Sequence, residues 1–205
     1  HILGAGSNTL ISDNTFDGVV IKLGKNFSNI SILPNGVIVA GSACPDKKLS
    51  DFAIENDLGN FEFLACIPGT VGGGIKMNAG CFRREFKDIL ISIQAINKEG
   101  RVLIIPKNKV IFEYRKNNLP DNLIFLSASF KGEKKNKDII EKEVFKLKNK
   151  KDNTQPTKTK TSGSTFKNPI NQSKKKVWQL IKESVPLDTS FGDACISDKH
   201  CNFFV

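Results

Sequence analysis

The sequence predicts an α+β fold. Segments with strand-like composition and segments with helical periodicity follow one another without a strict strand–helix–strand alternation. A glycine turn at residues 4–8 lacks the third glycine of a Rossmann fingerprint, because Thr9 stands at that position. Residues 89–105 have the pattern of an antiparallel hairpin. These three observations argue against a doubly wound parallel sheet.

In chain order, the first strands are expected at residues 19–23 and 37–43, separated by a turn at 34–36. Residues 46–58 predict an amphipathic helix, because Leu49, Phe52 and Ala53 share a face, and Gly59 is expected to end it. Strands at 89–96 and 102–105 flank the turn-forming residues 97–100 and predict a β-hairpin. Residues 123–130 predict a further strand.

A helix is expected at residues 138–150, where Ile140, Val144 and Leu147 recur on one side. The composition changes at residues 153–156, so we place a domain boundary there, with residues 1–155 as the first domain and 156–205 as the second. In the second domain, residues 157–163 read as extended and residues 176–183 as a short helix with Trp178 at its edge. Residues 202–205 resemble a strand whose partners lie outside the chain.

The chain is organised around a glycine-rich segment, residues 67–80, which has five glycines in fourteen residues. Each glycine inside a helix costs roughly 1 kcal/mol relative to alanine, so such a run needs a compensating use. Thr70 fits the N-cap of a short helix, whose start offers N–H donors and partial positive charge to a phosphate. A glycine-rich helix packed against a sheet explains the same composition, and the segment alone leaves both interpretations open. The second glycine turn, at residues 4–8, favours the phosphate.

The composition is that of an ordinary globular protein, with 39% hydrophobic and 25% charged residues. No apolar run approaches the ~20 residues of a membrane span, so we expect no membrane association and a cytoplasmic location. The sequence shows no signal peptide and begins with His1, and we expect a fragment that lacks both termini. The five cysteines fit no zinc or redox motif, which predicts reduced thiols and no metal. The oligomeric state is left open.

The positive charge gathers in residues 131–176, which contain fifteen Lys and no Arg against five Asp and Glu. This surplus of ten equals the net charge of the whole chain, +10. Such a block suits nucleic acid or the steering of an anionic substrate. A solvated helix and linker explain it better, because few aromatic side chains interleave the lysines. We therefore expect no nucleic-acid partner.

Four motifs in a fixed order carry a resemblance to a known family. They are G-A-G-S-N at residues 4–8, I-P-G-T-V-G-G at 67–73 with N-A-G at 78–80, Tyr114-Arg115, and G-S-T-F-K-N-P at 163–169. Together they resemble the UDP-N-acetylenolpyruvoylglucosamine reductase family, flavoenzymes that make UDP-N-acetylmuramate for peptidoglycan. The resemblance implies an FAD-binding fold of the vanillyl-alcohol-oxidase/PCMH type, followed by a smaller α+β substrate-binding domain, both incomplete. The first two motifs alone would indicate only the wider group of flavoenzymes with this fold. The alternative is therefore another FAD-dependent oxidoreductase of the same fold with a different substrate, which the Tyr114-Arg115 and Ser164 motifs disfavour.

The resemblance also implies a reaction, the NADPH-using and FAD-dependent reduction of UDP-N-acetylglucosamine enolpyruvate. Arg115 would lie beside the enolpyruvyl carboxylate, where a planar cation can bind both oxygens and stabilise an enolate. Ser164 would be the general acid, and a serine needs neighbouring charge for that task. Tyr114, Lys167 and Asn168 would contact the UDP-sugar. The residues expected to hold FAD are Gly4, Gly6, Ser7, Asn8, Ile67, Pro68, Gly69, Thr70, Val71, Gly72, Gly73 and Asn78.

Members of that family also carry a glutamate near the C-terminus, which this sequence does not reach. We therefore expect weak or absent turnover from the 205 residues alone and an active parent protein.

Overall fold

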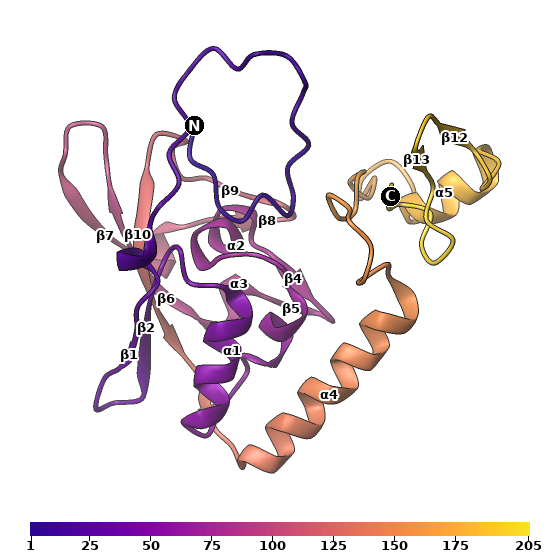
Figure 1. The fold of residues 1–205 in the computed structure, drawn as a ribbon. Coiled ribbons are helices and arrows are strands. Elements are labelled where there is room, and N and C mark those ends of the chain that lie inside the picture. The colour runs from indigo at the N-terminus through magenta and orange to yellow at the C-terminus, as the bar shows by residue number, and fades with distance from the viewer. The chain divides into compact units, whose positions relative to one another are not determined.

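The structure is a computed structural model that describes residues 1–205 and divides into two compact units (Figure 1). The first unit holds residues 1–5 and 16–148, and the second holds residues 6–15 and 149–205. The domain boundary expected after residue 155 stays a prediction.

A five-stranded antiparallel sheet forms the centre of the first unit, with the strand order β1-β2-β10-β6-β7. The strands are β1 (Ile30–Ile32), β2 (Val37–Gly41), β6 (Leu90–Ile96), β7 (Val102–Pro106) and β10 (Ile124–Lys131). In β10 the register shifts between Phe125 and Ser127, so the buried side chains fall at Phe125, Ala128 and Phe130 and do not strictly alternate. The bulge keeps all three apolar side chains in the core.

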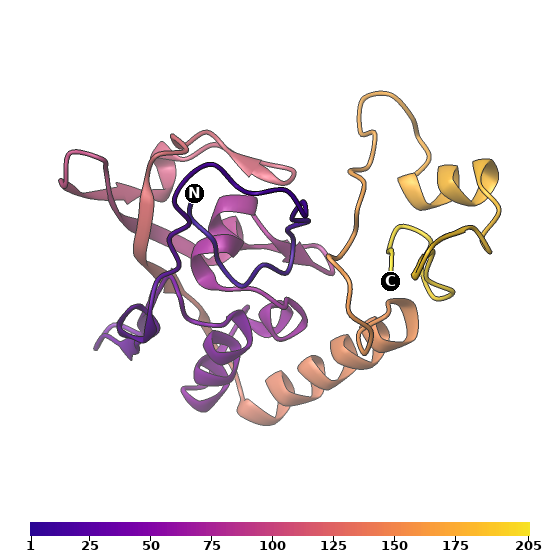
Figure 2. The same cartoon turned by 45° about the horizontal axis from the view of Figure 1, so that its top comes forward.

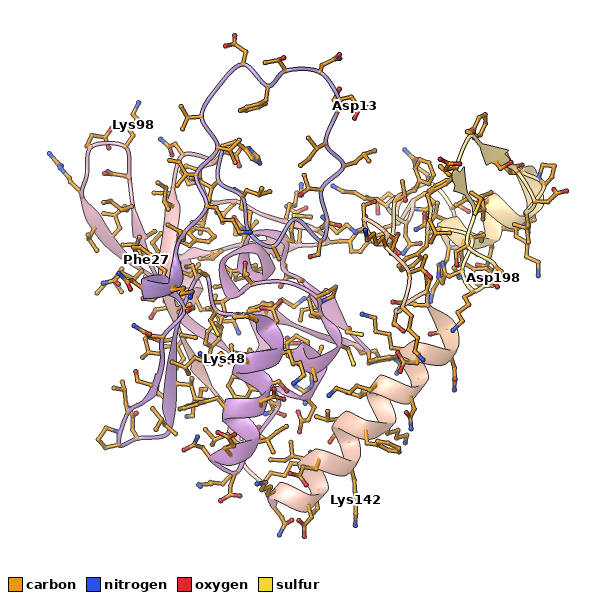
Figure 3. The ribbon with its side chains drawn as sticks, viewed as in Figure 1. Asp13, Phe27, Lys48, Lys98, Lys142 and Asp198 are labelled. Carbon is orange, nitrogen blue, oxygen red and sulfur yellow. The ribbon has the colours of Figure 1, made fainter.

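The β6–β7 hairpin confirms the turn expected at residues 97–100. The N–H of Gly100 donates to the carbonyl of Asn97 at 3.0 Å, and the Asn97 side chain accepts from the N–H of Arg101 at 2.9 Å. Gly100 has a φ of 78°, a conformation that glycine adopts without strain. Lys98, labelled in Figure 3, marks the tip of this hairpin.

Helices and short strand pairs complete the first unit. The helices are α1 (Asp46–Glu55), α2 (Val71–Met77), α3 (Phe86–Ile89) and α4 (Lys137–Thr154), which runs on into the second unit, and the single 3₁₀ turns are η1 (Lys25–Phe27), η2 (Glu62–Cys66) and η3 (Lys107–Lys109). The short antiparallel pairs are β3 (Leu58–Gly59) with β11 (Glu133–Lys134), β4 (Gly80–Cys81) with β5 (Arg84–Glu85), and β8 (Phe112–Glu113) with β9 (Lys116–Asn117).

Four buried phenylalanines hold the sheet and these helices together. Phe61 and Phe86 both contact Phe130 edge to face, with ring centroids 6.4 and 6.0 Å apart, and Phe63 meets Phe86 at 6.3 Å. Edge-to-face pairs add to the energy of burial alone. A smaller cluster joins Ile54 of α1 to Ile140 and Val144 of α4, as the spacing of the α4 side chains predicts.

The second unit contains helix α5 (Val177–Ser184) and the hairpin β12 (Ser190–Phe191) with β13 (Ala194–Cys195). Trp178 on α5 is 39% exposed, at the edge of the helix as expected. The G-S-T-F-K-N-P motif forms a loop with no regular secondary structure.

Three expectations about strands and helix ends are wrong. Residues 19–23 form only an isolated parallel bridge between Ile2 and Ile21, and the turn at 34–36 instead joins β1 to β2. Helix α1 ends at Glu55 and not at residue 58, because Asp57 has a φ of 56° and Leu58 pairs with β11. The C-terminal residues find their antiparallel partner inside the chain, where Phe204 bridges to Ile196.

Candidate active site

The structure places Gly4, the first residue of the first glycine turn, at the start of α2. Thr70 occupies the N-cap position of this helix, as the sequence predicts, although its side chain makes no capping hydrogen bond. A Cβ added to Gly4 would lie 2.9 Å from Thr70 Oγ1 and 4.0 Å from Gly73 Cα. The first residues of the chain therefore run directly beside α2 (Figures 1 and 2).

The five glycines of the segment serve two different purposes. At Gly69, an added Cβ would lie 2.6 Å from Asp46 Oδ2, and at Gly72 it would lie 3.0 Å from Ser42 Cβ. At Gly74 it would overlap the buried Phe86 ring, and at Gly80 it would overlap the main chain of β5. Gly73 differs, because its Cβ would only make an ordinary contact of 3.6 Å with Thr70 Oγ1. Close packing thus explains four glycines, and Gly73 leaves room beside Gly4.

Hydrogen bonds within the protein already occupy two of the backbone N–H groups at the start of α2. The N–H groups of Val71 and Gly72 donate to the carbonyls of Cys44 and Ser42, both at 2.9 Å. These two donors are engaged with the chain that follows β2. Gly6, with a φ of 78° and no atom within 4 Å of an added Cβ, lies in open space. In the first unit, Gly4 and Gly73 bring main chain without side chains to the start of α2, which fits an anionic cofactor that approaches the backbone closely.

A buried carboxyl group lies directly beneath the glycine segment. Asp46 opens α1 and is fully buried, and neither of its carboxylate oxygens has a hydrogen-bond partner. The hydroxyls of Ser42 and Ser50 nearby are also buried without partners. Burial raises the pKa of Asp46 to about 8, because the charged form is poorly solvated there. The carboxyl is therefore mainly neutral at pH 7.

Asn78 ends α2 in the left-handed region, with a φ of 44°, and is buried. Its Nδ2 donates to Glu85 Oε2 at 3.0 Å and to the carbonyl of Glu113 at 3.4 Å, and its Oδ1 accepts from the N–H of Lys87 at 3.2 Å. These contacts join the end of α2 to β5, α3 and β8. A contact between Asn78 and the cofactor stays a prediction.

Tyr114 and Arg115 form the two-residue loop between β8 and β9. The register pairs Glu113 with Lys116 and so leaves no other residue in the loop. Arg115 has a φ of 57°, and its Cζ lies 5.6 Å from the centroid of the Tyr114 ring. A guanidinium at this distance from a ring is attracted to it, which restricts where the cation points.

In the second unit, the loop that carries Ser164 is held by Asn202. The carbonyl of Asn202 accepts from the N–H of Thr165 at 2.9 Å, and its side chain exchanges two hydrogen bonds of 3.0 Å with the main chain of Phe166. Asn202 is 3% exposed. Asn202 is not among the residues predicted from the sequence, since a single asparagine near a chain end carries no local signal of such a contact.

The remaining predicted residues of this loop have distinct environments. A Cβ on Gly163 would lie 3.5 Å from the carbonyl oxygen of Ser7, so the structure brings part of the first glycine turn beside the motif. Asn168 Oδ1 accepts from the N–H of Val177 at 3.0 Å and so supports the start of α5. Lys167 is exposed. Arg115 belongs to the first unit and Ser164 to the second.

No group of three or more His, Cys, Asp or Glu side chains is placed to hold a metal ion, and no disulfide joins the cysteines. None of the helices has both the length and the apolar character needed to span a bilayer.

Comparison with known proteins assigns the chain to a class of protein. Residues 1–105, which include the glycine segment, match a family model described as an FAD binding domain, so this part of the chain is that of a flavin-binding protein. Residues 155–205 match the model of the UDP-N-acetylenolpyruvoylglucosamine reductase C-terminal domain. The chain belongs to the UDP-N-acetylenolpyruvoylglucosamine reductase family.

Relatives along the whole chain agree with this assignment. The chain is 77% identical over 205 residues to a UDP-N-acetylenolpyruvoylglucosamine reductase of Pelagibacter ubique, covering 100% of this chain and 68% of the relative. It is 46% identical over 202 residues to that of Rickettsia conorii, covering 98% and 67%. The crystal structure of the Thermus caldophilus UDP-N-acetylenolpyruvylglucosamine reductase superposes with a TM-score of 0.88 at 31% identity, covering 100% of this chain and 73% of that chain.

These findings confirm the expected family, the α+β fold class with its FAD-binding domain, and FAD as the cofactor. The roles of individual site residues stay predictions.

Proposed function

We propose that the protein to which this chain belongs reduces UDP-N-acetylglucosamine enolpyruvate to UDP-N-acetylmuramate, a precursor of peptidoglycan, with FAD as cofactor and NADPH as co-substrate. The observation that carries the proposal is the similarity to a reductase named for that substrate, which is 77% identical over all 205 residues of the chain. A cytoplasmic location and a UDP-sugar as the ligand follow from the same proposal.

The chain's own part begins with holding the cofactor. Gly4 and Gly73 supply main chain that a diphosphate can approach, and Thr70 offers a hydroxyl beside them. Bound FAD supplies the hydride chemistry that no side chain can perform. The protein's task is to orient the substrate and to stabilise charge.

Arg115 and Ser164 are the residues proposed to act on the substrate. The guanidinium of Arg115 binds the enolpyruvyl carboxylate through two N–H groups and stabilises the negative charge that develops beside it. Ser164 Oγ donates its proton to the carbon next to the carboxylate. Lys167, which is exposed in the same loop, is proposed to contact the UDP-sugar. Tyr114 and Asn168 are proposed to line the path of the UDP-sugar.

The test separates the two half-reactions in the full-length protein. Ser164→Ala is expected to leave the reduction of FAD by NADPH unchanged, because no substrate proton is involved in that step. The reoxidation of the flavin by enolpyruvyl substrate should slow about 100-fold or more, the usual contribution of a general acid. Ser162→Ala, two residues away in the same stretch, is the matched control and should retain both rates.

Stopped-flow absorbance of the flavin measures both steps. If Ser164→Ala retains both half-reactions, the assigned acid is wrong. A colourless full-length protein that binds nucleic acid tightly and in a salt-sensitive manner would contradict the proposal as a whole and favour the lysine block of residues 131–176 as the functional surface.

A further inference from the structure

The side chain of Asn117 joins the β8–β9 hairpin to the last turn of α2. Its Nδ2 donates to the carbonyls of Ile75 and Lys76, each at 3.1 Å, and its Oδ1 accepts from the N–H of Leu119 at 3.0 Å. The last four carbonyls of a helix have no partner within the helix. Asn117 therefore gives the Lys76 carbonyl a donor from another element, and it adds a second donor to the Ile75 carbonyl, which also accepts from the N–H of Asn78 at 3.1 Å.

The other strand of the hairpin is tied to the same helix end. Asn78, which follows α2, donates to the carbonyl of Glu113 in β8 at 3.4 Å. Lys76 Nζ reaches the Leu119 carbonyl at 3.5 Å and Asp121 Oδ1 at 2.6 Å, just beyond β9. Both strands that flank the loop of Tyr114 and Arg115 are thus anchored on α2.

The hairpin leaves little freedom for Arg115. Two residues join the paired positions Glu113 and Lys116, and Arg115 itself is in the left-handed region. When the strands are fixed, the main chain of Arg115 is fixed with them. The opposite end of α2 carries Thr70 and Gly73, beside Gly4. Seven helical residues rise about 10 Å, so one short rigid element separates the proposed flavin cradle from the hairpin.

We propose that Asn117 is a positioning residue for Arg115. Through its two hydrogen bonds to the end of α2, it sets the distance and orientation of the guanidinium relative to the cofactor. The inference rests on the proposed function, in which Arg115 binds the enolpyruvyl carboxylate. Asn117 itself touches neither substrate nor cofactor in this account.

A double-mutant cycle in the full-length protein tests this role. Asn117→Ala is expected to lower kcat/KM for the enolpyruvyl substrate 10- to 100-fold, the scale of a displacement of about 1 Å in a catalytic group. The rate of FAD reduction by NADPH and the affinity for FAD should change less than about twofold. In an Arg115→Ala background, Asn117→Ala should cause no further loss, because the group that it positions is gone.

Two further variants sharpen the test. Asn117→Asp keeps the size and the acceptor for Leu119 but loses both donors, and it should be as impaired as Asn117→Ala. Lys116→Ala is the matched control, since Lys116 is the neighbouring residue of the hairpin. Its side chain is exposed and forms an ion pair with Glu113. It should keep kcat/KM within about twofold of the wild type.

The outcomes distinguish the inference from the proposed function. If Arg115→Ala has no effect on the second half-reaction, the proposed role of Arg115 fails. If Arg115→Ala is impaired while Asn117→Ala is not, or if their effects multiply, the positioning role is wrong. Loss of FAD or of the fold in both Asn117 variants also overturns it, since the residue would then serve stability alone.

Discussion

Replacing the buried Asp46 with asparagine tests whether a neutral carboxyl lies under the glycine segment. The side chain is fully buried, its oxygens have no hydrogen-bond partner, and Oδ2 faces Gly69. Asparagine has nearly the same shape and carries no charge at any pH. The variant therefore removes the titration of this group and preserves its packing.

The size of the change in stability with pH follows from the pKa of the Asp46 carboxyl. A rise of the Asp46 pKa from 3.8 to about 8 sets an upper limit of about 6 kcal/mol on the change in the free energy of unfolding with pH, because each pH unit contributes about 1.4 kcal/mol. The position of Asp46 in the first turn of α1 opposes this rise, since the helix start favours a negative charge. That effect is worth about 1 kcal/mol, and at most ~2 kcal/mol, so burial dominates.

The sign is set by which state binds the proton. Below about pH 4 the carboxyl is protonated in both states and its effect is constant. Between about pH 4 and pH 8 the unfolded chain loses the proton and the folded chain keeps it. The free energy of unfolding should therefore fall as the pH rises through this window and level off above pH 8. The stabilising contribution is lost with increasing pH, not with acid.

Urea unfolding followed by far-UV circular dichroism at pH 5, 6, 7 and 8 measures the effect. The advantage of Asp46→Asn over the wild type should grow by roughly 2–4 kcal/mol from pH 5 to pH 8. Asp51→Asn, which removes an exposed carboxylate from the same helix, is the control and should show no such growth. A difference between wild type and Asp46→Asn that stays constant across this range would refute the reasoning.

Two further pairs of neighbouring residues are expected to behave differently. Gly73→Ala should leave the first unit as stable as before, or up to about 1 kcal/mol more stable, and should weaken FAD binding. Gly74→Ala should destabilise the same unit by about 1–3 kcal/mol, because the added methyl group overlaps the buried Phe86 ring. Thermal unfolding without FAD measures the stability of each variant, and flavin titration measures its affinity for FAD. Lys135→Ala should lower the free energy of unfolding by about 3 kcal/mol, because it leaves the nearly buried carboxylate of Glu62 unpaired. Lys134→Ala, which removes an exposed ion pair with Asp57, should lower it by less than about 0.5 kcal/mol in the same urea assay.

Local chemistry was sufficient to predict the elements whose interactions lie close in sequence. The β6–β7 hairpin follows from Asn97 and Gly100, which form the turn themselves. Helix α4 follows from a periodic apolar face, and its extent was underestimated by a few residues at the ends. The start of α2 at Thr70 was readable from the residue types around it.

Pairing between distant segments was not readable in the same way. Val19 and Val20 have strand-forming side chains, but both are exposed and find no partner strand, so propensity alone misled the prediction. Leu58 continues the apolar pattern of α1, but its pairing with Lys134 far along the chain takes it out of the helix. In both cases a tertiary partner, or its absence, decided the structure.

In the candidate site, too, some residues could be predicted from the sequence and others could not. The motifs that contain Arg115 and Ser164 were visible because of their resemblance to a family. The residues that support them were not, since Asn117 and Asn202 look like ordinary loop asparagines until the hydrogen bonds are seen. Asp46 resembles the usual exposed acid at a helix start, and only the packing of Gly69 over it reveals a buried group.

The chain contains a single tyrosine and a single tryptophan, and each belongs to a different unit. Tyr114 adjoins the proposed catalytic arginine in the first unit, while Trp178 lies on α5 in the second. In the absence of flavin, intrinsic emission excited at the indole band reports on the second unit only, and the phenol signal reports on the hairpin. The order in which the two units unfold can thus be followed by choosing the fluorescence wavelength, without attaching a dye.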